Sequence, residues 1–273
     1  MKKIFKSRSC IVIVVIIAIS LAVSSAGCSG GYSWESVTDG ESLVQVSTLD
    51  ALLNGVYDGV MDFKTLKEYG DFGIGTFDKL DGEMIGYDGR FYQIRADGKA
   101  YPVAGTMTTS FASVTFFDSD YEIELEAGMD YGELQEYLDG ILSTINVFYA
   151  VKIEGIFTGM RTRSVPAQEK PYPPLAEVTE NQPEFEFSEV SGVIAGFRSP
   201  SYMSTINVPG YHLHLLTEDK DAGGHILDFK IKEATAYIDE TQQFMMILPD
   251  PGSDFYKVDL SQYEQTDLEG IEN

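Results

Sequence analysis

Two Asp-Gly pairs, nine residues apart, constrain most strongly how this chain can fold. They are Asp88-Gly89 and Asp97-Gly98, within the segment GEMIGYDGRFYQIRADGKAYPV. Asp-Gly is a preferred dipeptide for tight turns between antiparallel strands, because glycine readily adopts the positive φ that such turns require. Apolar and aromatic residues flank both turns, as expected of strands. The sequence therefore predicts a meander of antiparallel strands within residues 75–117.

Helical patterns are few and short. Apolar residues recur at helical spacing in STLDALLNGVYDG, and KTLKEYGDFG is typical of a second short helix. Asp130 is a suitable N-cap for a third helix in MDYGELQEYLDGILS. Strand patterns fill most of the remainder: NVFYAVKIEGIFTGMRTRSV, SGVIAGFRSP, GYHLHLL, HILDFKIKEATAYID and FMMILP. We therefore expect an α+β fold of mostly antiparallel or mixed sheets in two packed regions, with a few short helices.

The first 28 residues have the composition of a secretory signal. A basic start is followed by an apolar run of about 13 residues and then by small residues, and this run is short for a membrane span. Ala26 and Gly27 precede Cys28 as in a bacterial lipobox. We expect an exported protein, either lipid-anchored at Cys28 on the outer face of the cytoplasmic membrane or secreted. A retained signal anchor is the alternative. Because Cys10 lies in the leader, no internal disulfide is expected.

The exported part divides into three by composition. Residues 29–42 are rich in glycine and serine and predict a flexible tether. We expect an N-terminal α+β sheet region over 43–175 and a C-terminal β-rich region over 176–273. The proline-rich segment PAQEKPYPPLAEVTENQPEFEF is interpreted as the connection between them.

The charge of the chain restricts its partners. The formal net charge is −24, and the leader contains basic residues but no acidic ones, so the exported part is more acidic still. Such a surface repels nucleic acids and anionic membranes. We therefore expect no nucleic-acid partner, and membrane contact only through a lipid anchor at Cys28.

All three histidines of the chain lie within one window, GYHLHLLTEDKDAGGH. In a strand, His212 and His214 project from the same face, with Leu213 on the other. A hairpin after TEDKDAGG brings His225 back beside them. Three imidazoles with a further open position are typical of a catalytic zinc or similar divalent ion. The alternative is three unrelated histidines that serve only as hydrogen-bonding groups.

Several long segments, in family order, resemble α-acetolactate decarboxylase. They are GIGTFDKLDGEMIGYDGRFYQIRADGKAYPV, FYAVKIEGIFTGMRTRSVPAQEKPYPPL and VSGVIAGFRSPSYMSTINVPGYHLHLLTEDKDAGGHILDF, together with the acidic C-terminal tail. The resemblance covers residue 43 to the end of the chain. It implies conversion of acetolactate to acetoin and CO₂ through a metal-stabilised enediolate, a homodimer, and a metal site near the junction of two packed β regions.

The resemblance also implies the residues of the site. His212, His214 and His225 match the family's metal-binding histidines, and Glu83 matches its metal-associated glutamate. Glu272 matches a second glutamate in the tail, with Glu269 as the alternative. Arg163 matches the active-site arginine, while Thr76 and Val165 match positions that line the substrate pocket. Glu83 and Glu272 are expected to bind the metal or to move protons, and Arg163 to hold the substrate carboxylate.

Two other functions are compatible with the histidines alone. The first is a non-catalytic zinc-binding extracytoplasmic lipoprotein, which would require neither Glu83 nor Arg163. The second is a zinc hydrolase that activates water, but the chain contains no HExxH motif. Zinc is the expected ion, although Mn²⁺, Fe²⁺ and Co²⁺ are accepted by similar donor sets.

Overall fold

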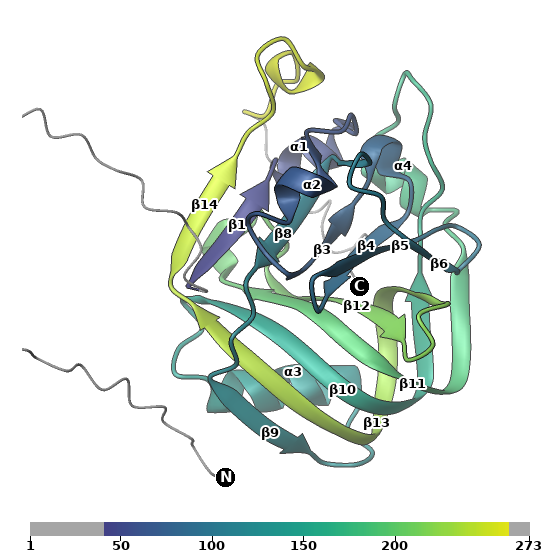
Figure 1. The fold of residues 1–273 in the computed structure, drawn as a ribbon, viewed down its shortest axis with the longest axis vertical. Coiled ribbons are helices and arrows are strands. Elements are labelled where there is room, and N and C mark those ends of the chain that lie inside the picture. Colours follow the sequence, from purple (N-terminus) through teal and green to yellow (C-terminus); the bar gives the residue numbers. More distant parts are fainter. Residues whose placement is uncertain (1–40, 262–273) are drawn as a thin grey trace, which may run out of the picture.

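The structure is a computed structural model that describes residues 41–261 (Figure 1). The signal, Cys28 and most of the expected tether lie outside these residues. Two sheets account for most of the described part, and no helix in it is both long and apolar enough to cross a bilayer. The prediction of a β-rich α+β fold with few helices is confirmed.

The first sheet has seven strands in the order β14-β1-β8-β3-β4-β5-β6. Their bounds are β1 (Ser42–Val46), β3 (Phe72–Thr76), β4 (Glu83–Tyr87), β5 (Arg90–Ile94), β6 (Ala100–Pro102), β8 (Phe111–Thr115) and β14 (Gln243–Ile247). The predicted meander is present as β4, β5 and β6, which pair antiparallel in sequence order. Its turns have positive φ at Gly89 and Gly98. A short ribbon, β2 (Met61–Asp62) with β7 (Thr108–Thr109), forms a separate two-stranded sheet.

The second sheet has five strands, β10-β11-β12-β13-β9, and four of them form a closed ring. Their bounds are β9 (Tyr121–Leu125), β10 (Phe148–Arg163), β11 (Glu184–Ser199), β12 (Gly210–Thr217) and β13 (Gly223–Thr241). The ring closes because β10 pairs antiparallel with β11 on one side and with β13 on the other. Closure leaves β10 with no free edge, so its many backbone groups are paired within the ring.

Strand β10 joins two cores by alternating its side chains. Phe148 and Ala150 pack against the first sheet, whereas Tyr149 and Val151 belong to the core on the other side. That second core is covered by α3 (Tyr131–Ile141), through the buried Leu134 and other apolar residues. The predicted third helix is therefore confirmed, and Asp130 caps it by accepting a hydrogen bond from the Glu133 backbone.

The other helices are short. They are α1 (Leu49–Leu53), α2 (Phe63–Leu66) and α4 (Leu175–Thr179), with 3-10 turns at η1 (Asp78–Leu80), η2 (Ser201–Met203) and η3 (Asp254–Tyr256). Helices α1 and α2 confirm the two helical patterns near the start of the described residues. The proline-rich segment is more structured than expected, since it contains α4 and the start of β11.

The two sheets do not divide the chain at residue 175. Strands β9 and β10 precede that position and belong to the five-stranded sheet. Strand β14 follows it, returns to the first sheet and pairs with β1 in parallel. Strands β1 and β9 were not anticipated from the sequence. The residues of β1 are all buried, so this strand shows no alternation of polar and apolar side chains.

Asp239 is a buried carboxyl group on β13 whose titration should affect stability. It is 3% exposed and accepts a hydrogen bond from the backbone of Asp118. Burial is the main cause that raises its pKa to about 8, and nearby carboxylates add to the shift. Between about pH 4 and pH 8 the folded state therefore keeps a proton that the unfolded state has lost, so the free energy of unfolding falls as pH rises through this window.

We expect Asp239→Asn to remove this pH dependence. At pH 8 the variant should be more stable than the wild type by at least about 2 kcal/mol, because its amide needs no proton to remain neutral. Urea unfolding at pH 5 and pH 8 measures the difference. Asp219→Asn is the matched control, because it makes the same substitution at an exposed aspartate after β12 that does not contribute to the raised pKa of Asp239. Equal pH slopes for wild type and Asp239→Asn would contradict the expectation.

Candidate metal centre

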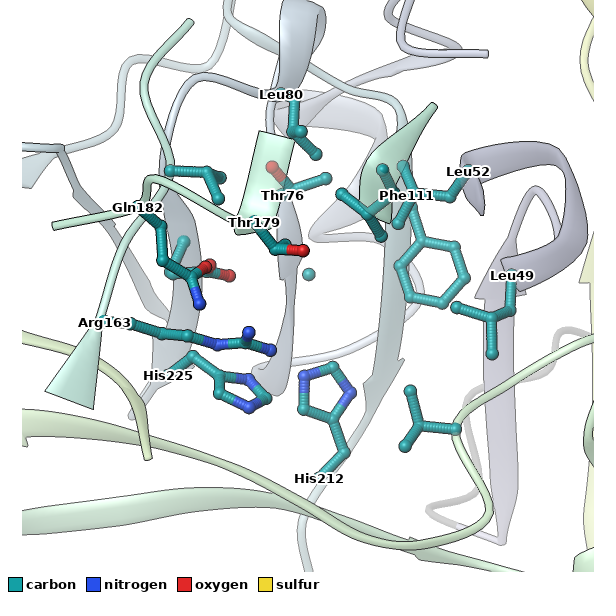
Figure 2. Close-up of a pocket in the computed structure, with 15 residues that line it drawn as sticks. Leu49, Leu52, Thr76, Leu80, Phe111, Arg163, Thr179, Gln182, His212 and His225 are labelled. Carbon is teal, nitrogen blue, oxygen red and sulfur yellow. The ribbon is translucent and has the colours of Figure 1, made fainter. Parts of the chain in front are cut away.

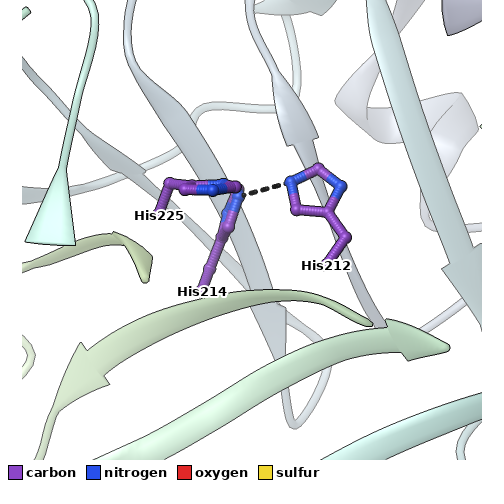
Figure 3. Close-up of side chains that lie close together, drawn as sticks. All are labelled: His212, His214 and His225. Atoms are coloured by element: carbon purple, nitrogen blue, oxygen red, sulfur yellow. Dashed lines mark hydrogen bonds between the residues drawn. The ribbon is translucent and has the colours of Figure 1, made fainter. Parts of the chain in front are cut away.

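Strand β12 presents two histidines from one face, as its alternation predicted. His212 and His214 project towards the first sheet, whereas Leu213 and Leu215 lie in the core covered by α3. The rings of the two histidines have centroids 5.0 Å apart (Figure 3). Both side chains are buried, with His212 9% and His214 0% exposed. The pair thus lies between the two sheets and not on the outer surface.

His225 joins the pair because β13 returns antiparallel beside β12. The backbone pairing places His214 directly opposite His225, which confirms the predicted hairpin. The ring centroid of His225 is 5.0 Å from that of His212 and 5.4 Å from that of His214. Gly224 makes this close approach possible: its φ is +135°, and a Cβ there would lie 2.5 Å from the carbonyl oxygen of Arg163.

A β-bulge in β13 turns His225 towards the pocket. Opposite β10, the pairing passes from Asp228 to Ile226, so Leu227 is an extra residue. Ile226 and Phe229 both lie in the core covered by α3, although they are three positions apart and regular alternation would place them on opposite faces. Regular alternation would place His225 on the same face as Phe229. The extra residue instead directs His225 to the side of His214.

The three imidazoles have the spacing that one metal ion requires. One ring nitrogen from each histidine lies within 4.8 Å of the others. The Nε2 atoms of His212 and His214 are 3.2 Å apart (Figure 3). Two nitrogen ligands at tetrahedral positions around zinc are separated by about 3.3 Å, given Zn–N bonds of about 2.0–2.1 Å. The donor set therefore fits a divalent ion.

A backbone carbonyl from the first sheet sets the tautomer of His214. Nδ1 of His214 lies 2.8 Å from the carbonyl oxygen of Met84 on β4. Because a carbonyl only accepts, Nδ1 must carry the hydrogen, and Nε2 then has a lone pair directed at the other histidines. Metal-binding histidines are usually oriented in this way, with the second ring nitrogen donating a hydrogen bond to an acceptor of the protein.

Burial keeps all three histidines neutral at physiological pH. It is the main cause that lowers the pKa of His212 to about 3, with the positive charge of Arg163 as a second cause. The pKa values of His214 and His225 are also well below the usual value, again mainly through burial. Neutral imidazoles have free lone pairs, so the pocket is electrostatically suited to bind a cation.

Glu83 lies at the start of β4, next to the histidines. Its Oε2 is 3.6 Å from Nε2 of His214. Thr76 pairs with Glu83 across the two strands, and its hydroxyl donates to the carbonyl of Gly82 at 2.7 Å. Thr76 thereby fixes the tight connection that positions Glu83. The structure thus brings a fourth donor, an oxygen, beside the three imidazoles.

One pocket opens onto the histidines (Figure 2). Arg163, at the end of β10, is 5% exposed, and its guanidinium extends over His225 towards His212. Val165 also lines the pocket. All sequence-predicted site residues within the described part are therefore in or beside one cavity. Glu269 and Glu272 lie outside the described residues.

Other pocket residues were not anticipated from the sequence. Six are apolar and come from α1, η1, β8, α4 and the loop before β12: Leu49, Leu52, Leu80, Phe111, Leu175 and Val208. Two are polar: Thr179 ends α4, and Gln182 follows it. Thr179 and Gln182 belong to the proline-rich segment that was interpreted as a connection. No local sequence pattern distinguished either residue from its polar neighbours.

Comparison with known proteins gives one consistent family. Residues 43–262 match the family model described as alpha-acetolactate decarboxylase. A relative of that name from Methanosarcina mazei is 53% identical over 84% of this chain and 80% of its own. The one from Bacillus subtilis is 43% identical over 80% of this chain and 85% of its own. The crystal structure of alpha-acetolactate decarboxylase from Bacillus subtilis strain 168 has a TM-score of 0.83, 41% identity, and coverage of 85% of this chain and 99% of that one.

Proposed function

Since this chain belongs to the alpha-acetolactate decarboxylase family, we propose that the three-histidine pocket is its active site. The chain converts acetolactate to acetoin and CO₂, and is therefore a carboxy-lyase. The observation that carries the assignment of the site is the meeting of three neutral imidazoles, Glu83 and Arg163 around a single pocket. A non-catalytic zinc carrier would require neither of the last two residues.

The reaction breaks the bond between the carboxylate and the carbon that bears the hydroxyl group. A bound divalent ion would supply a Lewis acid that stabilises the electrons left on the substrate oxygens when CO₂ departs. We propose that His212, His214, His225 and Glu83 hold this ion, together with Glu272 of the tail. Zinc is the proposed native ion, because neutral imidazoles and a carboxylate are suitable ligands for it.

Arg163 is proposed to bind the substrate carboxylate. Its guanidinium is buried beside the histidines, and a planar guanidinium matches a carboxylate through two parallel hydrogen bonds. Arginine remains protonated in proteins, so Arg163 orients the substrate and is not the proton donor. The carbon that loses CO₂ must gain a proton. Glu83 is proposed to hold or move that proton, with Glu272 as the second carboxylate in this role.

The apolar residues of the pocket complete the site. Leu49, Leu52 and Phe111 lie on the opposite side of the cavity from Arg163 (Figure 2). This side is suited to the methyl groups of acetolactate and to the exclusion of water around the reacting carbon. Thr76 and Val165, which also line the pocket, are proposed to contact the substrate.

We also propose where the protein works and in what form. The composition of residues 1–28 supports export, with lipid attachment at Cys28 or release as a secreted protein. A homodimer is proposed from the resemblance of the sequence to the family. Metabolic labelling with a radioactive fatty acid, in the wild type and in Cys28→Ala, tests the lipid anchor. Sedimentation of the purified protein tests the dimer.

Acetoin formation from racemic acetolactate tests the site as a metal-dependent one. Residues 29–273 are assayed as purified, after chelation and after return of Zn²⁺. We expect activity to disappear on chelation and to recover with the ion, because the proposed Lewis acid is removed and restored. Metal analysis of the protein as purified identifies the native ion. A protein that keeps full activity after complete removal of metal would contradict the proposal.

A further inference from the structure

Two buried polar atoms in the pocket have no hydrogen-bond partner among residues 41–261. They are Nε of Arg163 and Oε1 of Gln182. Leaving such an atom unpaired forfeits the hydrogen bond that water gave it, so buried polar atoms are almost always paired in folded proteins. Both atoms belong to residues that line the same cavity, which indicates a ligand that supplies the missing partners.

The two atoms have opposite requirements. Nε of Arg163 is a donor and needs an acceptor, whereas Oε1 of Gln182 is an acceptor and needs a donor. Both side chains lie on the same side of the cavity (Figure 2). The opposite side is apolar, with Leu49, Leu52 and Phe111. The pocket therefore has one polar side with a donor next to an acceptor, and one side suited to alkyl groups.

A short 2-hydroxy acid with an alkyl branch matches this arrangement. Its carboxylate accepts from the guanidinium, and its hydroxyl group, one carbon away, donates to the amide oxygen. Acetolactate has this grouping at its central carbon. Building on the function proposed above, we propose that Gln182 is a substrate-binding residue whose Oε1 accepts a hydrogen bond from the tertiary hydroxyl of acetolactate.

This role gives Gln182 a part in specificity. A site built to bind a hydroxyl group rejects an analogue without it, because the buried acceptor is then left unpaired. Gln182 thus selects acids that carry the hydroxyl, while Arg163 binds any carboxylate of suitable size. The two residues come from different elements, since Gln182 follows α4 and Arg163 ends β10.

The test compares two unreactive acids of nearly equal shape. They are 2-hydroxy-2-methylpropanoate and 2,2-dimethylpropanoate, which differ by a hydroxyl in place of a methyl group. Calorimetric titration of the metal-loaded protein gives the ratio of their dissociation constants. We expect Gln182→Met to reduce the preference for the hydroxy acid about tenfold, the effect of one lost hydrogen bond. A preference due to the metal is common to all variants and cancels in the comparison.

Two further variants exclude a merely structural effect. Gln242→Met makes the same substitution at an exposed glutamine outside the pocket and should leave the ratio unchanged. Gln182→Glu keeps an acceptor of the same shape, so it should retain the ratio while both acids bind more weakly beside the added negative charge. An unchanged ratio in Gln182→Met, or the same loss in Gln242→Met, would overturn the role of Gln182. A failure of the proposed function would be recognised by a different result, because the wild type itself would then form no acetoin in a metal-dependent way.

Discussion

A His214→Ala variant is expected to lose its bound metal ion and its acetoin formation together. His214 is fully buried, its Nε2 faces the other histidines, and Met84 fixes its tautomer. Removing a residue that only orients a metal ligand already lowers affinity by about 10–100-fold. Removing the ligand should therefore cost at least about 100-fold in metal affinity. Competition with a chromogenic chelator measures that affinity, and acetoin formation is assayed in parallel.

Tyr211→Phe is the control on the same strand. The Tyr211 hydroxyl donates to Asp139, away from the histidines, so its loss should leave the metal affinity unchanged. Circular dichroism confirms that both variants are folded. If His214→Ala bound the ion as tightly as the wild type, the three-histidine centre would be wrong as a description of the metal site.

Replacing Arg163 by alanine is expected to lower kcat/KM for acetolactate about 10³-fold and to leave one ion bound per chain. The reduction corresponds to about 4 kcal/mol, in the range for removing one partner of a buried, hydrogen-bonded charge pair. Metal binding should persist because the histidines and Glu83 are unchanged. Steady-state kinetics and metal analysis of the same preparation separate the two effects.

Arg161→Ala provides the matched control for Arg163→Ala. Both arginines are on β10, but Arg161 is exposed and absent from the pocket lining. Its removal should change kcat/KM by less than about twofold, since exposed charges contribute little at a distance. Equal losses in the two variants would point to a general effect of charge and would refute a specific role for Arg163.

Local patterns in the sequence were sufficient for several parts of the fold. The Asp-Gly turns predicted the meander, and Asp130 predicted the start of α3. The alternation around His212 and His214 predicted that both project from one face. In each case the information lies within a few neighbouring residues, so no distant contact had to be known.

Features that depend on distant contacts were not predicted. The parallel pairing of β1 with β14 joins residues near 42 to residues near 243, and no local pattern encodes it. The bulge at Leu227 is also invisible in the sequence, because it is defined by the count of residues opposite β10. The resemblance to the family identified Glu83 and Arg163. Gln182 was not identified, because it lines the pocket only through the tertiary position of the segment that follows α4.

The closed ring of β10 to β13 has a consequence for the order of events during folding. The pairing that closes it, β10 with β13, joins segments as far apart in sequence as Phe148 and Thr241, and such a pairing forms slowly because the intervening chain must first be closed into a loop. His214 acquires its tautomer from Met84, which belongs to the other sheet. An isolated β12–β13 hairpin would therefore lack the orienting carbonyl. High metal affinity should arise only after both sheets have docked, so uptake of the ion reports completion of the whole structure.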